Sequence, residues 1–106
     1  MTDIILVLTT APDDEAEKLA RAILEEHLAA CVNVQPPMTS LYWWRGNIER
    51  DAECQIVIKT TRAHLDALTA RLTALHSYEV PEMLVVPVTW AAEPYIEWVK
   101  ASTGGE

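Results

Sequence analysis

Apolar positions recur along this chain with two different periods, and together they predict four strands and three helices. Residues Ile4 to Thr10 form a continuous apolar and β-branched run, which is typical of a central strand buried on both faces. Pro12 and three acidic residues follow and predict a helix start, with Asp14 and Glu17 at capping-box spacing. Apolar side chains then recur on one helical stripe, which predicts an amphipathic helix on a sheet, at Ala16, Leu19, Ala20, Ile23, Leu24, His27 and Leu28.

The stretch from Thr39 to Thr60 predicts a long β-hairpin with an aromatic arm. Its first strand carries four bulky side chains in succession, namely Leu41, Tyr42, Trp43 and Trp44. Because strand side chains alternate, both faces of this strand are large and apolar. Gly46 accepts positive φ and Asn47 tolerates it, so residues 45–47 can reverse the chain. Helices on one side of a sheet cover only one face of the arm, and we therefore expect a second chain to cover the other.

The second half of the chain predicts a helix, a strand and a last helix. Thr61 can cap the first of these helices, whose leucines repeat at spacings of three and four, at Leu65, Leu68, Leu72 and Leu75. Residues Met83 to Trp90 read as a strand, and residues Glu93 to Ala101 read as the C-terminal helix.

This order of elements reads as two βαβ crossovers joined by the hairpin. Right-handed crossovers put both helices on one face and give the strand order 4-1-3-2, with the second and fourth strands at the edges. Pro36-Pro37 falls in the second strand and Pro87 in the fourth, as expected if proline is confined to edges and bulges. The prediction is an α+β fold, a ferredoxin-like βαββαβ sandwich with an extra C-terminal helix.

The composition and the net charge of the chain exclude some classes of binding partner. A chain of 106 residues is one domain that can bury a single core, here residues 1–106. Its net charge of −8 argues against binding to nucleic acid or to an anionic membrane surface. Met1-Thr2-Asp3 has no basic region and the apolar run that follows is too short for a signal or a membrane span, so we expect a cytoplasmic protein. Cys31 and Cys54 have no CxxC partner and read as small buried hydrophobes.

Several segments, in this order and spacing, resemble the CutA family of divalent-cation tolerance proteins. They are Thr10 to Asp13, Leu28 to Asn33, Ser40 to Gly46, Ile58 to Thr60 and His76 to Glu82. The resemblance implies a ferredoxin-like fold assembled as a tight homotrimer, similar in architecture to PII signalling proteins. It implies that the long second and third strands extend each sheet into its neighbours, with Tyr42, Trp43 and Trp44 at the interface.

The candidate site is a ligand cleft at the end of the second helix. It gathers Lys59 with an imidazole, a phenol and two carboxylates from the following turn, namely His76, Tyr78, Glu79 and Glu82. Pro81 restricts its own φ and the conformation of the residue before it, so the turn should hold a definite shape. The alternative is structural: His76 interacts with the carbonyls at the helix end, Tyr78 packs at a subunit boundary, and Lys59 pairs with Glu53 or Glu82.

A copper site is the second interpretation. Cu(I) prefers thiolate or thioether ligands and Cu(II) prefers imidazole, with two or more such ligands converging. Copper-binding members of the similar family use a first-strand cysteine and neighbouring histidines, where this chain has Thr9, Leu75 and Ser77 around the remaining His76. The metal ligand would therefore be His76, with Cys31, Met83 or Glu79 as helpers. His27 and His64 read as structural, because neither has a ligand partner three or four residues away.

Three function classes follow from these observations. The first is a non-catalytic trimeric scaffold that responds to metal ions. Its clefts bind a cation, a small ligand or a protein partner. It requires no cofactor, and Cu²⁺ or another divalent cation is its candidate ligand. The second is a direct copper-binding protein. The third is a small hydrolase with His76, Tyr78 and Glu82 as acid and base, which is disfavoured because the sequence has no nucleophile elbow, phosphate loop or HExxH motif.

Overall fold

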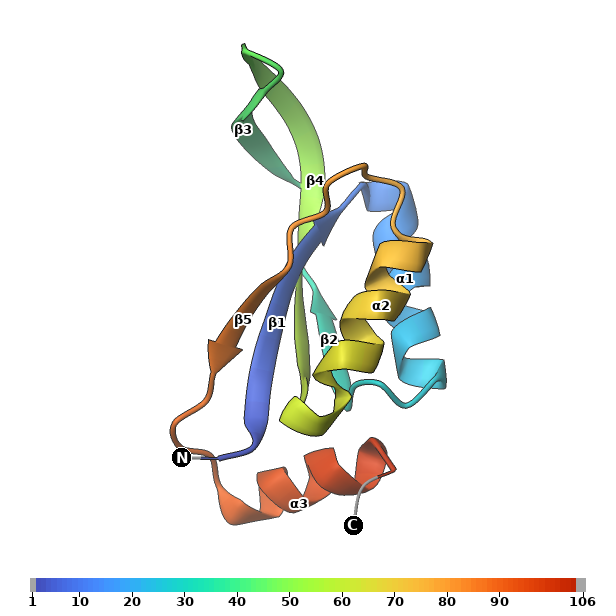
Figure 1. Cartoon of the computed structure of the whole chain (residues 1–106), viewed down its shortest axis with the longest axis vertical. Helices are drawn as coiled ribbons and strands as arrows, with labels where there is room; N and C mark the ends of the chain where they lie inside the picture. The colour runs from blue at the N-terminus through green and yellow to red at the C-terminus, as the bar shows by residue number, and fades with distance from the viewer. Residues whose placement is uncertain (1, 105–106) are drawn as a thin grey trace.

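The computed structural model describes residues 2–104 as one antiparallel sheet with helices against it (Figure 1). The elements are β1 (Ile4–Ala11), α1 (Asp13–Glu25), β2 (Cys31–Val34), β3 (Met38–Trp44), β4 (Asn47–Thr61), η1 (Arg62–His64), α2 (Leu65–Leu75), β5 (Leu84–Pro87) and α3 (Glu93–Ser102). The strand order is β2-β4-β1-β5, with β3 also paired to β4. This order is the predicted 4-1-3-2, with the second strand divided into β2 and β3.

Proline explains that division. Pro36 and Pro37 lie between β2 and β3, where the missing N–H groups interrupt pairing with β4. Pro87 ends β5 at the other edge of the sheet. The predicted strand, Met83 to Trp90, therefore extends three residues beyond the end of β5 and begins one residue before it.

The core lies between the sheet and helices α1 and α2, which cover one face of it (Figure 1). Alternate residues of β1 and β4 point into this layer and are fully buried, namely Ile5, Val7, Ile56 and Ile58. The helices contribute Leu19, Ile23, Leu68 and Leu72 to the same cluster. The predicted stripes therefore face the core, with Leu28, Leu65 and Leu75 partly buried against it. Leu24 is 37% exposed and His27 lies beyond the end of α1 at positive φ.

Neither predicted helix cap makes a side-chain capping bond, although Thr61 does stand at the N-cap position of η1. Helix α1 begins at Asp13 directly after Pro12, so Asp14 already lies inside the first turn and makes no capping bond. Thr61 does precede the η1 segment, but its hydroxyl lies 2.8 Å from Nδ1 of His64 and contacts no backbone N–H at the helix start. The acidic residues of α1 still lie at the positive end of the helix dipole.

The hairpin of β3 and β4 projects beyond the helices as an arm (Figure 1), and the molecule is accordingly elongated, with extents of 46 × 26 × 24 Å. Trp44 pairs with Asn47, so the turn has two residues, Arg45 at φ 49° and Gly46 at φ 83°. The prediction for Gly46 is confirmed. The prediction for Asn47 is wrong, because Asn47 is already the first residue of β4 and Arg45 adopts the second positive φ.

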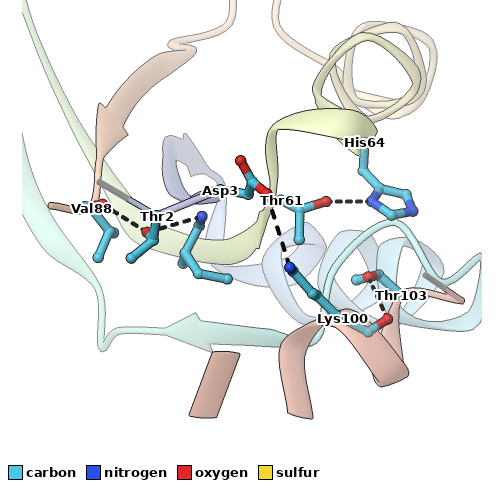
Figure 2. Close-up of polar contacts among 8 residues, drawn as sticks. Thr2, Asp3, Thr61, His64, Val88, Lys100 and Thr103 are labelled. Carbon is cyan, nitrogen blue, oxygen red and sulfur yellow. Dashed lines mark hydrogen bonds and ion pairs between the residues drawn. The ribbon is translucent and has the colours of Figure 1, made fainter. Parts of the chain in front are cut away.

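Helix α3 crosses the end of the sheet opposite the arm (Figure 1). Figure 2 shows the polar contacts that hold this end: the Thr2 hydroxyl donates to the Val88 carbonyl at 2.7 Å, and Lys100 Nζ lies 4.0 Å from an Asp3 carboxylate oxygen. Val99 of α3 is fully buried. These contacts anchor the C-terminal helix at this end and leave the other end of the sheet to the arm.

Candidate functional site

A pocket of about 540 Å³ lies between the arm and the turn that follows α2. It is lined by residues of β1, β3, β4 and the turn, namely Thr10, Ser40, Leu41, Tyr42, Trp43, Trp44, Glu53, Tyr78, Glu79, Val80 and Glu82. The structure thus places three predicted cleft residues, Tyr78, Glu79 and Glu82, in one pocket with the three aromatic residues of the arm.

His76 stands behind this pocket and binds backbone with both ring nitrogens. Its Nε2 lies 2.6 Å from the carbonyl oxygen of Thr10, and its Nδ1 accepts the N–H of Tyr78 at 3.1 Å. A carbonyl can only accept, so the proton belongs on Nε2 and the ring is the neutral Nε2–H tautomer. His76 therefore fastens the turn to β1, and a metal ion could bind it only by replacing one of these two bonds.

Tyr78 fixes the other side of the turn. Its hydroxyl donates to Oε1 of Glu53 at 2.9 Å, and its ring lies 4.7 Å from the His76 ring between centroids. Burial, and then the hydrogen bond to the Glu53 carboxylate, raise the pKa of Tyr78. Tyr78 is accordingly a neutral donor, and it links the turn directly to β4.

Tyr42 makes the equivalent contact within the arm. Its hydroxyl donates to Oδ2 of Asp51 on the neighbouring strand. That bond, followed by desolvation and by the negative charges of Asp51, Glu49 and Glu53, raises the pKa of Tyr42 to about 12. The two phenols thus share a strip of carboxylates on one face of β4, because Glu49, Asp51 and Glu53 are alternate residues of the strand.

The remaining carboxylates hold the turn against the arm and β4. Glu79 pairs with Arg45 at 3.2 Å, and the Arg45 guanidinium carbon lies 5.2 Å from the centroid of the Trp44 ring. Glu82 accepts from Nε2 of Gln55 at 3.4 Å. The turn is therefore fastened at several points to β1, β4 and the hairpin.

Lys59 does not join this cluster. It pairs in register with Leu6 and Cys31, on the part of β4 nearer α3. It lies four positions along β4 from Gln55, a distance of about 13 Å at 3.3 Å per residue. Within one chain Lys59 does not line the pocket, and none of the ion pairs among the described residues joins it to Glu53 or Glu82. Its place in a cleft between subunits stays a prediction.

The proposed copper helpers are also dispersed. Cys31 lies beside Lys59 at the edge strand, whereas Met83 packs against the hydrophobic core. Cys54 is buried, its thiol lies 3.6 Å from Asp13, and burial raises its pKa. Across residues 2–104, no group of three or more His, Cys, Asp and Glu side chains is arranged to hold a metal ion.

Three residues that line the pocket or bond to its lining were not predicted as cleft residues, namely Thr10, Arg45 and Glu53. Glu53 carried a usable signal, because strand alternation places it on the face opposite the buried Cys54 and Ile56. Thr10 acts through its backbone carbonyl, and a carbonyl has no signature in the sequence. Arg45 was assigned only to the turn, and its pairing with Glu79 spans 34 positions.

The sheet order, the two helices on one face and the extra C-terminal helix define a ferredoxin-like α+β protein, as predicted. A model of the CutA1 divalent ion tolerance protein family matches residues 5–102. The chain belongs to this family, and the resemblance seen in the sequence is confirmed.

Relatives and solved structures agree with this assignment. The chain is 43% identical to the divalent-cation tolerance protein CutA of Pectobacterium atrosepticum over 103 residues, which are 96% of this chain and 94% of that protein. It is 47% identical to the chloroplastic CutA 1 of Oryza sativa over 93% of this chain, but spans only 56% of that longer protein. The crystal structure of CutA from Xylella fastidiosa superposes with a TM-score of 0.92 at 39% identity, covering 96% of this chain and 99% of that one.

Proposed function

We propose that this protein is a homotrimeric, non-catalytic scaffold that acts in the response to divalent metal ions, copper among them, and binds a cation or small ligand in its cleft. The family's definition by divalent ion tolerance supports the divalent-ion response. The scaffold itself rests on one observation, the uncovered apolar surface of the arm and of the sheet face opposite α1 and α2.

On the arm, Leu41 and Trp43 are 68% and 71% exposed, and Tyr42 on its other face is 40% exposed. Register places Leu84 opposite Leu8 and Val86 opposite Leu6, on the sheet face that the two helices leave open. Leu84 and Val86 are 55% and 41% exposed. Apolar surface of this extent is characteristic of a subunit interface.

The trimer is the assembly implied by the resemblance, with an architecture similar to PII signalling proteins and with Tyr42, Trp43 and Trp44 at the interface. A cytoplasmic setting is part of this proposal. Among the described residues no helix is long and apolar enough to cross a membrane. Among similar proteins the rice and Arabidopsis relatives are named chloroplastic and an archaeal structure is named periplasmic, so the compartment differs between family members.

The non-catalytic role is supported by the bonding of the candidate acid and base groups. Both nitrogens of His76 are bonded to backbone, and the Tyr78 hydroxyl donates to a carboxylate. A general base must be able to reach a substrate proton, and His76 could do so only by releasing the turn. Binding of a partner protein or a small ligand at the cleft would leave the hydrogen bonds of His76 and Tyr78 intact.

Native mass spectrometry across a Cu²⁺ and Zn²⁺ titration tests the proposal. We expect a trimer whose metal uptake does not change when His76 is replaced by alanine. A trimer that takes up one or three copper ions at low micromolar concentration, and loses them in His76→Ala, would favour the direct copper-binding interpretation. A monomer at micromolar protein concentration would contradict the scaffold.

A further inference from the structure

A second pocket, of about 350 Å³, lies between the start of η1 and the C-terminal end of α3, at the end of the sheet opposite the arm. We call it the α3 pocket, and its polar lining consists of Asp3, Thr61, Arg62, His64, Lys100 and Thr103. We propose that it binds the phosphate group of a small phosphate monoester. This site is separate from the cleft of the proposed function, since the two pockets share no lining residue.

The α3 pocket is positive in an acidic protein. Sixteen Asp and Glu residues against eight Lys and Arg give the chain its net charge of −8. In the pocket the balance is reversed, because two cationic side chains, Arg62 and Lys100, and the His64 imidazole lie with the single carboxylate of Asp3. A compact anion gains from these nearby groups, whereas a polyanion would extend over the acidic remainder of the surface and be repelled. The charge distribution therefore favours a small phosphate ester over a nucleic acid.

Lys100 has hydrogen-bond donors to offer. Its Nζ lies 4.0 Å from an Asp3 carboxylate oxygen, which is beyond hydrogen-bond length, and the two side chains are 43% and 69% exposed. An exposed ion pair of this kind contributes little to stability. A phosphate dianion could therefore take the ammonium from Asp3.

Arg62 brings a second cation to the same pocket. Its backbone N–H donates to the Asp3 carbonyl at 2.9 Å, which joins the start of η1 to the N-terminal segment. The guanidinium has five N–H donors, so it can serve an anion beside any other contact that it makes. Its planar fork matches two phosphate oxygens at once, which an ammonium cannot do.

His64 can add a third donor without losing the contact it already makes. Its Nδ1 lies 2.8 Å from the hydroxyl of Thr61, which is buried (Figure 2). A hydroxyl can donate or accept, so Thr61 can donate to Nδ1 when the ring proton is on Nε2. A phosphate dianion only accepts, and beside Nε2 it would favour this tautomer. The pair of Thr61 and His64 is thus held in place and adjusts to the anion.

The α3 pocket is preformed and lies apart from the proposed subunit interface. The Thr103 hydroxyl at its edge is buried and donates to the Val99 carbonyl at 2.9 Å, and Val99 itself is fully buried. A volume of about 350 Å³ exceeds what a phosphate group alone needs and suits a small ester. Neither the aromatic residues of the arm nor Leu84 and Val86 line it, so the interface proposed above does not use these side chains.

The test is a titration of the full chain with methyl phosphate, followed by the backbone amide signals in proton–nitrogen NMR spectra, with KCl holding the ionic strength constant. At a pH of about 7.5 methyl phosphate is largely a dianion, because its second pKa is about 6. Methyl sulfate is the matched probe, since it is tetrahedral with a single charge. We expect saturable shifts at residues 61–64 and 100–103, none at residues 42–51 of the arm, and binding of methyl sulfate at least threefold weaker.

Equal affinities for the two compounds would overturn the inference, as would the absence of saturable shifts at the α3 pocket. The oligomeric state of the protein does not enter this test. It can therefore fail while the trimeric scaffold stands, and it can succeed while the scaffold fails.

Substitutions of the pocket charges should change the affinity in opposite directions. Lys100→Gln should weaken methyl phosphate binding about three- to tenfold, because it removes a charge-assisted hydrogen bond. Asp3→Asn should strengthen binding about two- to threefold, because the ammonium no longer shares its charge with a carboxylate. Lys18→Gln, exposed on α1, removes the same charge away from the pocket and should leave binding unchanged.

Equal weakening by Lys100→Gln and Lys18→Gln would mean that the anion responds only to the overall charge of the protein. An Asp3→Asn variant that binds methyl phosphate no better than the parent would mean that the Lys100 ammonium does not meet the phosphate. Either result would overturn the site.

Discussion

Histidine is a common residue of functional sites, but the hydrogen bonds of His76 in this structure are structural. The residue lies just after α2, where an imidazole can serve as ligand, as base or as a link between backbone segments. The hydrogen bonds in the structure are those of the last role, because both ring nitrogens are bonded to backbone of β1 and of the turn. Sequence reasoning found the residue and the two alternatives, but choosing between them required the distance to Thr10, which is 66 positions away.

Replacing His76 with alanine should therefore destabilise the fold. We expect a loss of about 1–3 kcal/mol in the free energy of unfolding, because a buried carbonyl and a backbone N–H lose their partner. Urea denaturation measures this. Ser77→Ala is the control, since it removes only an exposed hydrogen bond to Glu15 and should cost less than about 1 kcal/mol. Equal costs would contradict the structural role of His76.

Tyr42 gives a prediction in alkaline solution. Its folded pKa of about 12 lies above the usual value of 10.0, so its neutral form is the one that the fold favours. The stability that it contributes is complete below pH 10 and is lost as the pH rises toward 12. Absorbance at 295 nm follows the ionisation.

In this titration Tyr42→Phe should remove a step near pH 12. Asp51→Asn should move that step to lower pH, because the hydrogen bond to Asp51 is the main cause of the shift. Glu97→Gln, on α3, should leave the step in place. An unchanged step in Asp51→Asn would show that another group raises the pKa of Tyr42.

At the scale of elements, alternation and periodicity were sufficient to place most of the helices and strands. They failed where several neighbouring residues suit the same position in a turn or at a helix start. The hairpin turn is one such place. In residues 45–47 the sequence favours positive φ at Gly46 and Asn47, and only the pairing of Trp44 with Asn47 assigns it to Arg45 and Gly46. The helix starts are another, because an acidic first turn permits more than one first residue.

The turn assignment predicts that Gly46→Ala destabilises the arm. A Cβ at Gly46 meets no atom within 4 Å, so the expected cost of about 1 kcal/mol comes from positive φ alone. Amide hydrogen exchange of β3 and β4 should become faster in this variant. Asn47→Ala is the matched control, and a larger effect there than at Gly46 would contradict the two-residue turn.

At the scale of the whole molecule, the arm and the open sheet face expose apolar side chains that the proposed partner subunits would cover. A cover for the arm was expected from the succession of four bulky residues in one strand. The structure adds that the arm projects past the helices (Figure 1), so α1 and α2 cover neither of its faces along its outer part. The interface of the proposed trimer therefore extends along the arm.

Trp44→Ala should weaken assembly, since truncation of a large aromatic anchor at an interface costs several kcal/mol, about 2 or more. Size-exclusion chromatography and native mass spectrometry over a dilution series should show dissociation at higher protein concentration than in the parent. Trp90→Ala, 78% exposed and outside the arm, is the control. Assembly as stable as that of the parent would place the interface elsewhere.

The sequence by itself determined the order of strands and helices, the strand order of the sheet and the aromatic arm, because periodicity, proline and glycine act within a few residues of one another. The family was identified from the order and spacing of five segments that resemble it. Tertiary structure decided the composition of the pocket. It joined Thr10 to His76, Glu53 to Tyr78 and Arg45 to Glu79, and it kept Lys59 apart. Such contacts depend on register and on the path of a turn between distant strands, and neither has a local signature in the chain.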